Sequence, residues 1–152
     1  MNGDIDTSIT DTFDPARVAR FILGRAHPGW LGLRYVAHGA DWVELTLPWR
    51  GDLVGEDGTG VIASGPIISL MDMAAGMAIW STSGVFEPVA TLDLRVDYMR
   101  PARPRAAVSG RVQCYRRTRS AAFVRGTAHD GDPDDPVAHI AGVFMTIPWR
   151  AA

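Results

Sequence analysis

The segment 66–83 constrains the fold more than any other part of this sequence. Its apolar residues cover every side of a helix instead of one stripe, which is typical of a helix that is surrounded by protein. Asp72 is its single ionisable residue. The apolar stretch around it, which Ser64 and Asp72 interrupt, never reaches the roughly 18 continuous apolar residues of a membrane span. We therefore predict a central helix that the rest of the chain encloses.

Strand patterns before and after this helix predict the sheet that encloses it. Apolar and polar residues alternate with a period of two, as in half-buried strands, and the short late connections favour antiparallel pairing. An amphipathic helix at 13–26, with Asp14 as N-cap and Pro15 in its first turn, comes before the sheet. The sequence thus predicts an α+β fold, with an antiparallel six-stranded sheet around one central helix and a short N-terminal helix. The predicted strands are 31–37, 42–48, 89–99, 106–115, 121–128 and 137–147.

The chain length of 152 residues predicts a single domain, in which residues 1–12 form a flexible acidic tail. The start lacks the pattern of a secretory signal, so we expect a cytoplasmic protein. Cys114 stands alone, which excludes an internal disulfide and a cysteine-based zinc site. We expect no metal and no cofactor. The last strands are apolar on both faces, which predicts that a second subunit covers the excess.

Two features of the central helix have both a structural and a chemical interpretation. Asp72 is either a structural carboxylate satisfied by an arginine or by backbone amides, or a base whose basicity rises in a partly apolar site. Ser64 and Pro66 are explained by ordinary helix capping. The same helix start, at Ser64 and Gly65, also leaves backbone N–H groups where a developing oxyanion would be stabilised. No serine or cysteine triad, phosphate loop or dinucleotide fingerprint is present.

Basic residues are concentrated between Arg95 and Arg125, where nine arginines face the single acid Asp97. Three interpretations stay open: a solvated sheet edge, a site for a phosphate-bearing small ligand, and a nucleic-acid surface. The net charge of −2 and the lack of interleaved aromatic residues argue against nucleic acid.

Two stretches resemble the hotdog-fold acyl-CoA thioesterases of the phenylacetate-degradation (PaaI) type. The first runs from Gly60 to Gly76 and reads GVIASGPIISLMDMAAG; the second runs from Ala90 to Ala102 and reads ATLDLRVDYMRPA. The resemblance covers about residues 31–148. It implies a helix wrapped by an antiparallel sheet, assembly into homodimers and often homotetramers, and hydrolysis of a CoA thioester to a free acid and CoA.

The resemblance also implies roles for individual residues. Asp72 corresponds to the acid that acts as base or nucleophile, and Ser64 to the residue whose amide binds the oxyanion. Thr91 falls at a hydroxyl that helps hold the attacking water, and Asp57 at an asparagine beside the thioester. This sequence departs from the family in having Ala63, Ser64 and Asp57 where the family has His, Gly and Asn. We expect the CoA phosphates, which belong to the substrate, to contact Arg100, Arg103, Arg116 and Arg117.

Helix geometry gives an independent constraint on this mechanism. Ser64 and Asp72 are eight residues apart, about 12 Å along a helix, whereas a base and an oxyanion donor must each lie near 3 Å from the reacting group. Two central helices that meet antiparallel across a twofold axis would bring one of these residues from each subunit together. The resemblance implies an acyl-CoA thioesterase, the helix geometry predicts that two subunits share its site, and we expect no membrane partner. A non-catalytic acyl-CoA-binding protein is the alternative that Ala63 and Asp57 favour, and a hotdog dehydratase lacks a histidine with an evident acidic partner.

Overall fold

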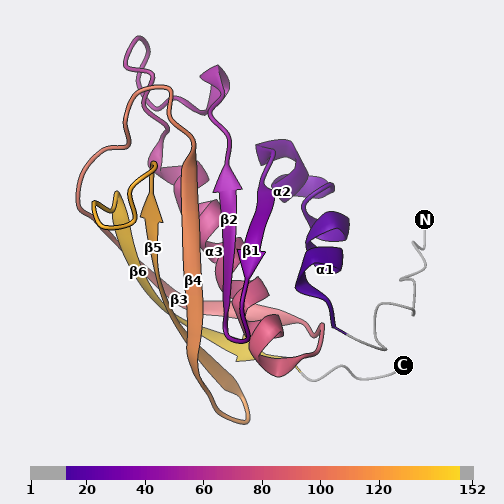
Figure 1. The fold of residues 1–152 in the computed structure, drawn as a ribbon. Helices are drawn as coiled ribbons and strands as arrows, with labels where there is room; N and C mark the ends of the chain where they lie inside the picture. The colour runs from indigo at the N-terminus through magenta and orange to yellow at the C-terminus, as the bar shows by residue number, and fades with distance from the viewer. Residues whose placement is uncertain (1–12, 148–152) are drawn as a thin grey trace.

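A computed structural model describes residues 13–147 of the chain. A six-stranded sheet curls around one long helix, and two short helices lie beside the first strand (Figure 1). This is the hotdog fold, and it confirms the predicted fold class. The expected tail at residues 1–12 lies outside the described residues. In chain order the elements are α1 (Pro15–Ile22), α2 (Ala26–Leu31), β1 (Arg34–His38), β2 (Trp42–Leu47), the 3-10 turn η2 (Gly51–Leu53), α3 (Ser64–Ser83), β3 (Val89–Tyr98), β4 (Val108–Arg117), β5 (Ala121–His129) and β6 (Ala138–Thr146).

The strand order in the sheet is β1-β2-β4-β5-β6-β3, and every neighbouring pair is antiparallel. The chain leaves the β1–β2 hairpin, passes through α3, and enters β3 at the opposite edge of the sheet. The next three strands, β4, β5 and β6, then fill the space between β2 and β3, and each is antiparallel to its neighbours. As a result β1 and β3 are the two edge strands, and β3 begins shortly after α3 ends.

Helix α3 is enclosed because its sequence is apolar on nearly all sides, as the pattern predicts. Ten of its residues are buried, with the densest burial from Ala74 to Trp80. Gly110 of β4 allows the close approach of helix and sheet, because a Cβ there would lie 2.4 Å from the sulfur of Met71. Gly84, in the left-handed conformation, ends the helix and donates its N–H to the carbonyl of Trp80.

The N-terminal helix predicted over 13–26 is instead two short helices. The predicted cap is confirmed, since the Asp14 carboxylate accepts a 2.9 Å hydrogen bond from the Ala16 N–H and Pro15 opens α1. The chain then leaves the helical conformation after Leu23 and reaches a positive φ of 48° at Ala26. A second helix starts there and runs to Leu31, so the first strand begins at Arg34 and not at residue 31 as predicted.

Residues 13–147 leave one side of α3 and the neighbouring edge of β3 uncovered. On α3 the exposed or half-buried residues fall at helical spacing along Ser64, Ile68 and Asp72. On and just after β3, Leu92 and Met99 are each 61% exposed. A ten-residue edge strand with exposed large apolar side chains is a ready surface for pairing with another chain.

Candidate active site

The start of α3 presents two backbone N–H groups that have no partner in the helix. Ala63 is the N-cap, and its own N–H donates to the carbonyl of Leu53 at 2.8 Å. Proline has no N–H, so Pro66 contributes none. The helix is 20 residues long, and its first orphan donors are therefore the amides of Ser64 and Gly65. Both residues are exposed, and a Cβ at Gly65 would meet nothing within 4 Å, so an acceptor atom has open access to this end of the helix.

The prediction that Ser64 caps this helix with its side chain is wrong. Ser64 is the first helical residue, Ala63 takes the cap position, and no side chain forms a capping hydrogen bond. The physical reason lies in the Ala63 N–H bond to Leu53, which fixes the chain in an extended conformation one residue earlier than expected. The amide sites at this helix start are consequently not occupied by a side-chain cap, which leaves them available for a ligand.

A cavity of about 350 Å³ opens beside the helix start. Its wall includes Tyr98 at the end of β3, whose O–H donates a 3.1 Å hydrogen bond to the main-chain carbonyl of Ser64. Burial raises the pKa of the Tyr98 hydroxyl, so it remains protonated and able to donate at neutral pH. This contact ties the first turn of α3 to the edge strand. The remaining lining is mostly apolar: Val61, Ile62, Ile67, Met99, Pro101, Ala102 and Val137, with Ser64 and Arg100.

Asp72 lies two turns further along the uncovered side of α3, and it is half-buried rather than fully buried. Thr91 of β3 donates a 2.7 Å hydrogen bond from its Oγ1 to Oδ1 of Asp72. No cation in residues 13–147 comes within 4.0 Å of this carboxylate, so the structural alternative of an internal ion pair does not occur in the described chain. The structure thus brings Asp72 and Thr91 together, and Oδ2 of Asp72 has no hydrogen-bond partner among residues 13–147.

Ser64 and Asp72 lie on one side of the same helix, with Ile68 midway between them. Eight residues at 1.5 Å rise separate the two by about 12 Å along the axis. One protomer therefore cannot place both groups on one reacting carbonyl. Asp57 is another residue that the resemblance assigns to the site. It lies in an exposed turn of the loop between η2 and α3, and its side chain makes no hydrogen bond to the other described residues.

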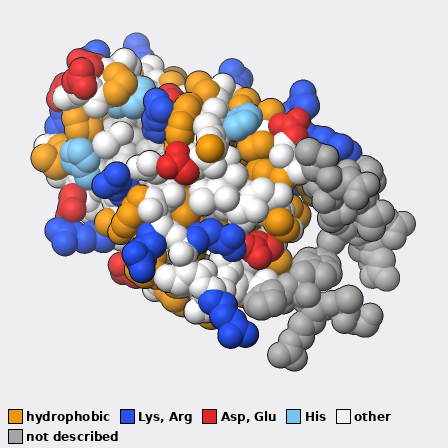
Figure 2. Space-filling model, turned by 60° about the horizontal axis from the view of Figure 1, so that its bottom comes forward, with side chains coloured by type: hydrophobic (Ala, Val, Ile, Leu, Met, Phe, Trp, Pro, Cys, Tyr) orange, Lys and Arg blue, Asp and Glu red, His pale blue; other side chains and the backbone are white. Residues whose placement is uncertain are grey.

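The four arginines expected to contact the substrate phosphates do not form one cluster. Arg100 and Arg103 follow β3 near the start of α3, whereas Arg116 and Arg117 end β4 near the other end of the helix. Arg117 there pairs with Glu87, which follows α3. A 20-residue helix spans about 30 Å, so one phosphate group cannot touch both pairs within a protomer. Figure 2 shows basic side chains interspersed with acidic and hydrophobic ones on one face of the molecule.

Arg100 has an internal partner that the sequence did not predict. Its guanidinium forms two hydrogen bonds, 2.7 and 2.8 Å long, to the carboxylate of Asp130, whose side chain is fully buried. The same carboxylate accepts a 2.7 Å hydrogen bond from the N–H of Arg103, and Arg100 also bonds the carbonyl of Asp135. These contacts join the segment after β3 to the loop between β5 and β6. They hold the wall of the cavity beside Ser64, and they occupy most of the donors that Arg100 would offer to a phosphate.

Replacing Asp130 with asparagine is expected to lower the free energy of unfolding by roughly 3 kcal/mol, because it leaves the part-buried guanidinium of Arg100 with only the exposed carboxylate of Asp135, 3.1 Å from its Nε. The Arg100 guanidinium, with help from the Arg103 N–H, holds the pKa of Asp130 well below its usual value of 3.8 although burial acts in the opposite sense. A lowered pKa means that this contribution is complete above the ordinary pKa and is lost as the pH falls below about 4. Urea unfolding of both proteins from pH 7 to pH 3 should show a constant difference that shrinks only at the acidic end. A difference that stays unchanged down to pH 3 would contradict the assignment to this ion pair.

Comparisons with known proteins agree with the fold. The thioesterase superfamily matches residues 59–137, the part of the chain that contains the loop before α3, α3 itself and strands β3 to β5. A search of curated proteins finds no match. Within residues 13–147 no helix is both long and apolar enough to cross a membrane, and no cluster of His, Cys, Asp or Glu side chains is arranged to hold a metal ion.

Solved structures extend the likeness over almost the whole chain. A protein from Pseudomonas aeruginosa is 38% identical, with a TM-score of 0.79 over 88% of this chain and 100% of that one. A thioesterase from Haemophilus influenzae is 18% identical, with a TM-score of 0.77 over 91% and 93% of the two chains. The PaaI protein from the phenylacetic acid degradation operon of E. coli is 16% identical, with a TM-score of 0.73 over 88% and 94%. The last two identities are low and show the fold alone.

The fold and the family match together define the class of protein: a hotdog-fold thioesterase. The chain belongs to the thioesterase superfamily.

Proposed function

We propose that this protein hydrolyses an acyl-CoA thioester to a free acid and CoA, in a site that two protomers share. The observation that carries the proposal is the arrangement along α3, where unpartnered amides at Ser64 and Gly65 and the carboxylate of Asp72 lie on one uncovered side about 12 Å apart. If two α3 helices pack antiparallel with Ile68 near the twofold axis, the helix start of one protomer faces Asp72 of the other. Two equivalent sites result.

The helix start supplies the electrophilic half of the site. The thioester carbonyl oxygen accepts hydrogen bonds from the Ser64 and Gly65 amides, and the positive end of a long helix dipole stabilises the charge that develops on that oxygen. Because these amides are backbone groups, Ser64 serves as well here as the glycine of the family. The neighbouring cavity of about 350 Å³, with its mostly apolar wall, suits an apolar section of the substrate.

Asp72 supplies the nucleophilic half. Its carboxylate takes a proton from a water molecule, and the water oxygen bonds to the thioester carbon. Collapse of the tetrahedral intermediate then breaks the carbon–sulfur bond, and the CoA thiolate leaves and takes up a proton. Direct attack by the carboxylate, followed by hydrolysis of the anhydride, gives the same products. The hydrogen bond from Thr91 to Oδ1 holds the carboxylate with Oδ2 turned to the substrate side, so Thr91 acts as a positioning residue.

The uncovered edge of β3 supports the pairing of protomers. Leu92, Tyr98 and Met99 are exposed beside the uncovered side of α3, and a second copy would bury all of them together with Ile68. We propose a homodimer through this surface. Association of two such dimers into a homotetramer is compatible with this interface. Asp57, in the exposed turn before the helix start, keeps the role beside the thioester that the family resemblance implies. Arg103, exposed next to the same cavity, is the best placed of the four predicted arginines to contact a phosphate of CoA.

The test of the function is a screen for thiol release from a panel of aryl-CoA and alkyl-CoA esters. We expect turnover of at least one class at a rate in the range of ordinary enzymes, about 1 per second or faster. Binding of the same esters, measured by calorimetry, distinguishes the alternative that Ala63 and Asp57 favour. Tight binding of acyl-CoA with no thiol release on any ester would identify a non-catalytic acyl-CoA-binding protein and refute the proposal.

A further inference from the structure

The outer face of the sheet, on the side away from α3, carries a second group of functional side chains. Along β4, β5 and β6 the inward positions are buried against α3, whereas Arg111, Thr127 and His139 point outward and lie in one row across the strands. Gln113 and Arg125 are paired in the next row, beside Trp42 of β2. The residues in these two rows lie on the opposite side of the sheet from Ser64 and Asp72.

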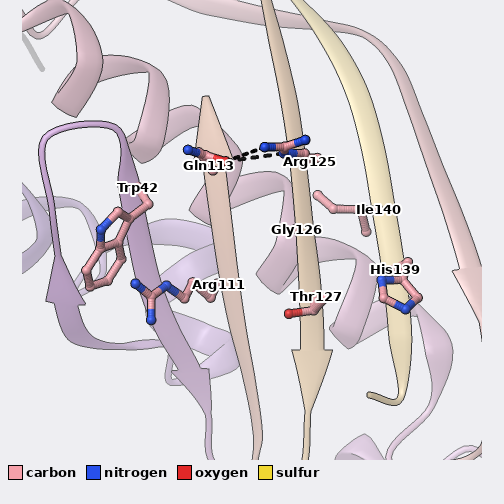
Figure 3. Close-up of a pocket in the computed structure, with 8 residues that line it drawn as sticks. All are labelled: Trp42, Arg111, Gln113, Arg125, Gly126, Thr127, His139 and Ile140. Atoms are coloured by element: carbon pink, nitrogen blue, oxygen red, sulfur yellow. Dashed lines mark hydrogen bonds between the residues drawn. The ribbon is translucent and has the colours of Figure 1, made fainter. Parts of the chain in front are cut away.

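These rows enclose a hollow of about 430 Å³ (Figure 3). Thr127, with its short side chain, lies between Arg111 and His139, and Gln113 and Arg125 lie in the neighbouring row (Figure 3). Trp42 and Arg111 stand on one side, His139 on the other, and Gln113 with Arg125 closes one end. The hollow therefore exists because a small residue in β5 is flanked by large residues in the neighbouring strands.

Both guanidinium groups are held in place by neutral neighbours. The guanidinium of Arg111 stacks on the ring of Trp42, 3.6 Å from its centroid. Arg125 donates two hydrogen bonds, each 3.2 Å long, to Oε1 of Gln113, whose own amide nitrogen is fixed by a 2.7 Å bond to Asp41. Among the described residues neither Arg111 nor Arg125 has a carboxylate within 4.0 Å. Two positive charges are thus oriented without a counter-ion.

Three acids flank these rows, and each has another partner: Asp41 accepts the hydrogen bond from Gln113, and Glu44 and Asp97 lie opposite Arg111 and His139 in the strand register. Glu44 pairs with Arg111 in the strand register, but its carboxylate lies 3.7 Å from the ring of His129. Asp97 is opposite His139 in the register, and it forms an ion pair with Arg95 at 3.0 Å. The lining of the hollow itself contains two arginines and no carboxylate, which favours an anionic ligand.

We propose that this hollow binds the phosphate group of a small molecule. A carboxylate is planar and is satisfied by one guanidinium through two parallel bonds. The donors here stand on several sides of the hollow, namely two guanidinium groups, the Thr127 hydroxyl and the His139 ring, and this arrangement suits the oxygens of a tetrahedral group. The site is separate from the proposed hydrolytic site and does not depend on that function.

Isothermal titration calorimetry with inorganic phosphate, pyrophosphate and ADP, at constant ionic strength, tests this site. Arg111→Gln and Arg125→Gln are each expected to weaken the binding of these probes by roughly tenfold, because each removes a charged hydrogen-bond donor. Arg20→Gln is the matched control, since Arg20 is exposed on α1, away from the sheet's outer face. Stronger binding of pyrophosphate or ADP than of inorganic phosphate would assign the site to the phosphate of a larger molecule, and equal binding would assign it to the free ion.

Two results would overturn the proposal. The first is that no probe binds, or that all probes bind the Arg111→Gln, Arg125→Gln and Arg20→Gln proteins equally. The second is that the Arg111→Gln and Arg125→Gln changes alter the mass measured by sedimentation while no probe binds the unchanged protein. That result would assign the hollow to a contact with a second copy of the chain. Neither result bears on thioester hydrolysis, which is measured separately.

Discussion

Replacing Asp72 with asparagine is expected to lower kcat/KM for thioester hydrolysis by about 10²-fold or more, the usual contribution of a positioned base. Asparagine has nearly the same shape, and its side-chain oxygen still accepts the hydrogen bond from Thr91 that orients the carboxylate. It cannot take a proton from water or form an anhydride. The variant should therefore keep the fold and the affinity for acyl-CoA while it loses the chemical step, which separate measurements of turnover and of binding can establish.

Asp134→Asn is the matched control for this change. It removes the same charge from an exposed side chain in the loop between β5 and β6 that neither lines the cavity beside Ser64 nor contacts Asp72. Equal hydrolysis by the Asp72→Asn and Asp134→Asn proteins would remove Asp72 from the mechanism. A lower melting temperature in the Asp72→Asn protein than in the Asp134→Asn protein would instead indicate that the carboxylate of Asp72 stabilises the fold.

The central helix and the sheet could be predicted from the sequence because their patterns are regular over many residues. A helix that is apolar on all sides must be enclosed, and alternating strands with short connections enclose it most simply as an antiparallel sheet. The sequence could not predict two separate N-terminal helices, because the break between them depends on a positive φ at Ala26. Alanine rarely adopts that conformation, so its presence does not indicate a break. The segment after it contains Pro28 and Gly29, which are typical of a turn, yet it forms α2.

In the candidate site, too, features that depend on neighbouring residues in the sequence could be predicted, whereas contacts between distant residues could not. Asp72 is recognisable because it is the single charge in an apolar helix, and its contact with Thr91 joins two residues that the family resemblance nominated. The partner of Arg100 is 30 residues away, in a loop with several acids, and nothing in the spacing distinguishes Asp130 from its neighbours. For this reason the sequence predicted that Arg100 contacts the substrate, whereas in the structure its guanidinium bonds the buried carboxylate of Asp130.

Replacing Ser64 with proline is expected to lower kcat for thioester hydrolysis by about 10²-fold, the usual effect of removing one oxyanion donor. Proline lacks the amide N–H but is well suited to the first position of a helix. Ala63 before it already has φ −61° and ψ 158°, the extended conformation that a following proline requires. The substitution thus deletes one hydrogen-bond donor with little change to the backbone, and circular dichroism should show unchanged helix content.

Ser64→Ala is the control, because it removes the hydroxyl and keeps the amide. Near wild-type turnover in Ser64→Ala, together with the loss in Ser64→Pro, assigns the effect to the backbone N–H. A similar loss in both variants would assign it to the side-chain hydroxyl and would contradict the proposed oxyanion site.

Mixing the Ser64→Pro and Asp72→Asn proteins turns these two variants into a test of the shared site. In a heterodimer, one site combines the intact helix start of the Asp72→Asn protomer with the intact Asp72 of the Ser64→Pro protomer, and the other site carries both changes. Random exchange of protomers makes half of the dimers mixed, each with one working site, so the mixture should recover about a quarter of the wild-type rate. A site contained in one protomer gives no recovery on mixing, because every site then keeps one of the two defects. The rate of the mixture after exchange, compared with the same two proteins assayed before exchange, therefore decides whether Asp72 acts on the carbonyl held by its own helix or by the helix of its partner.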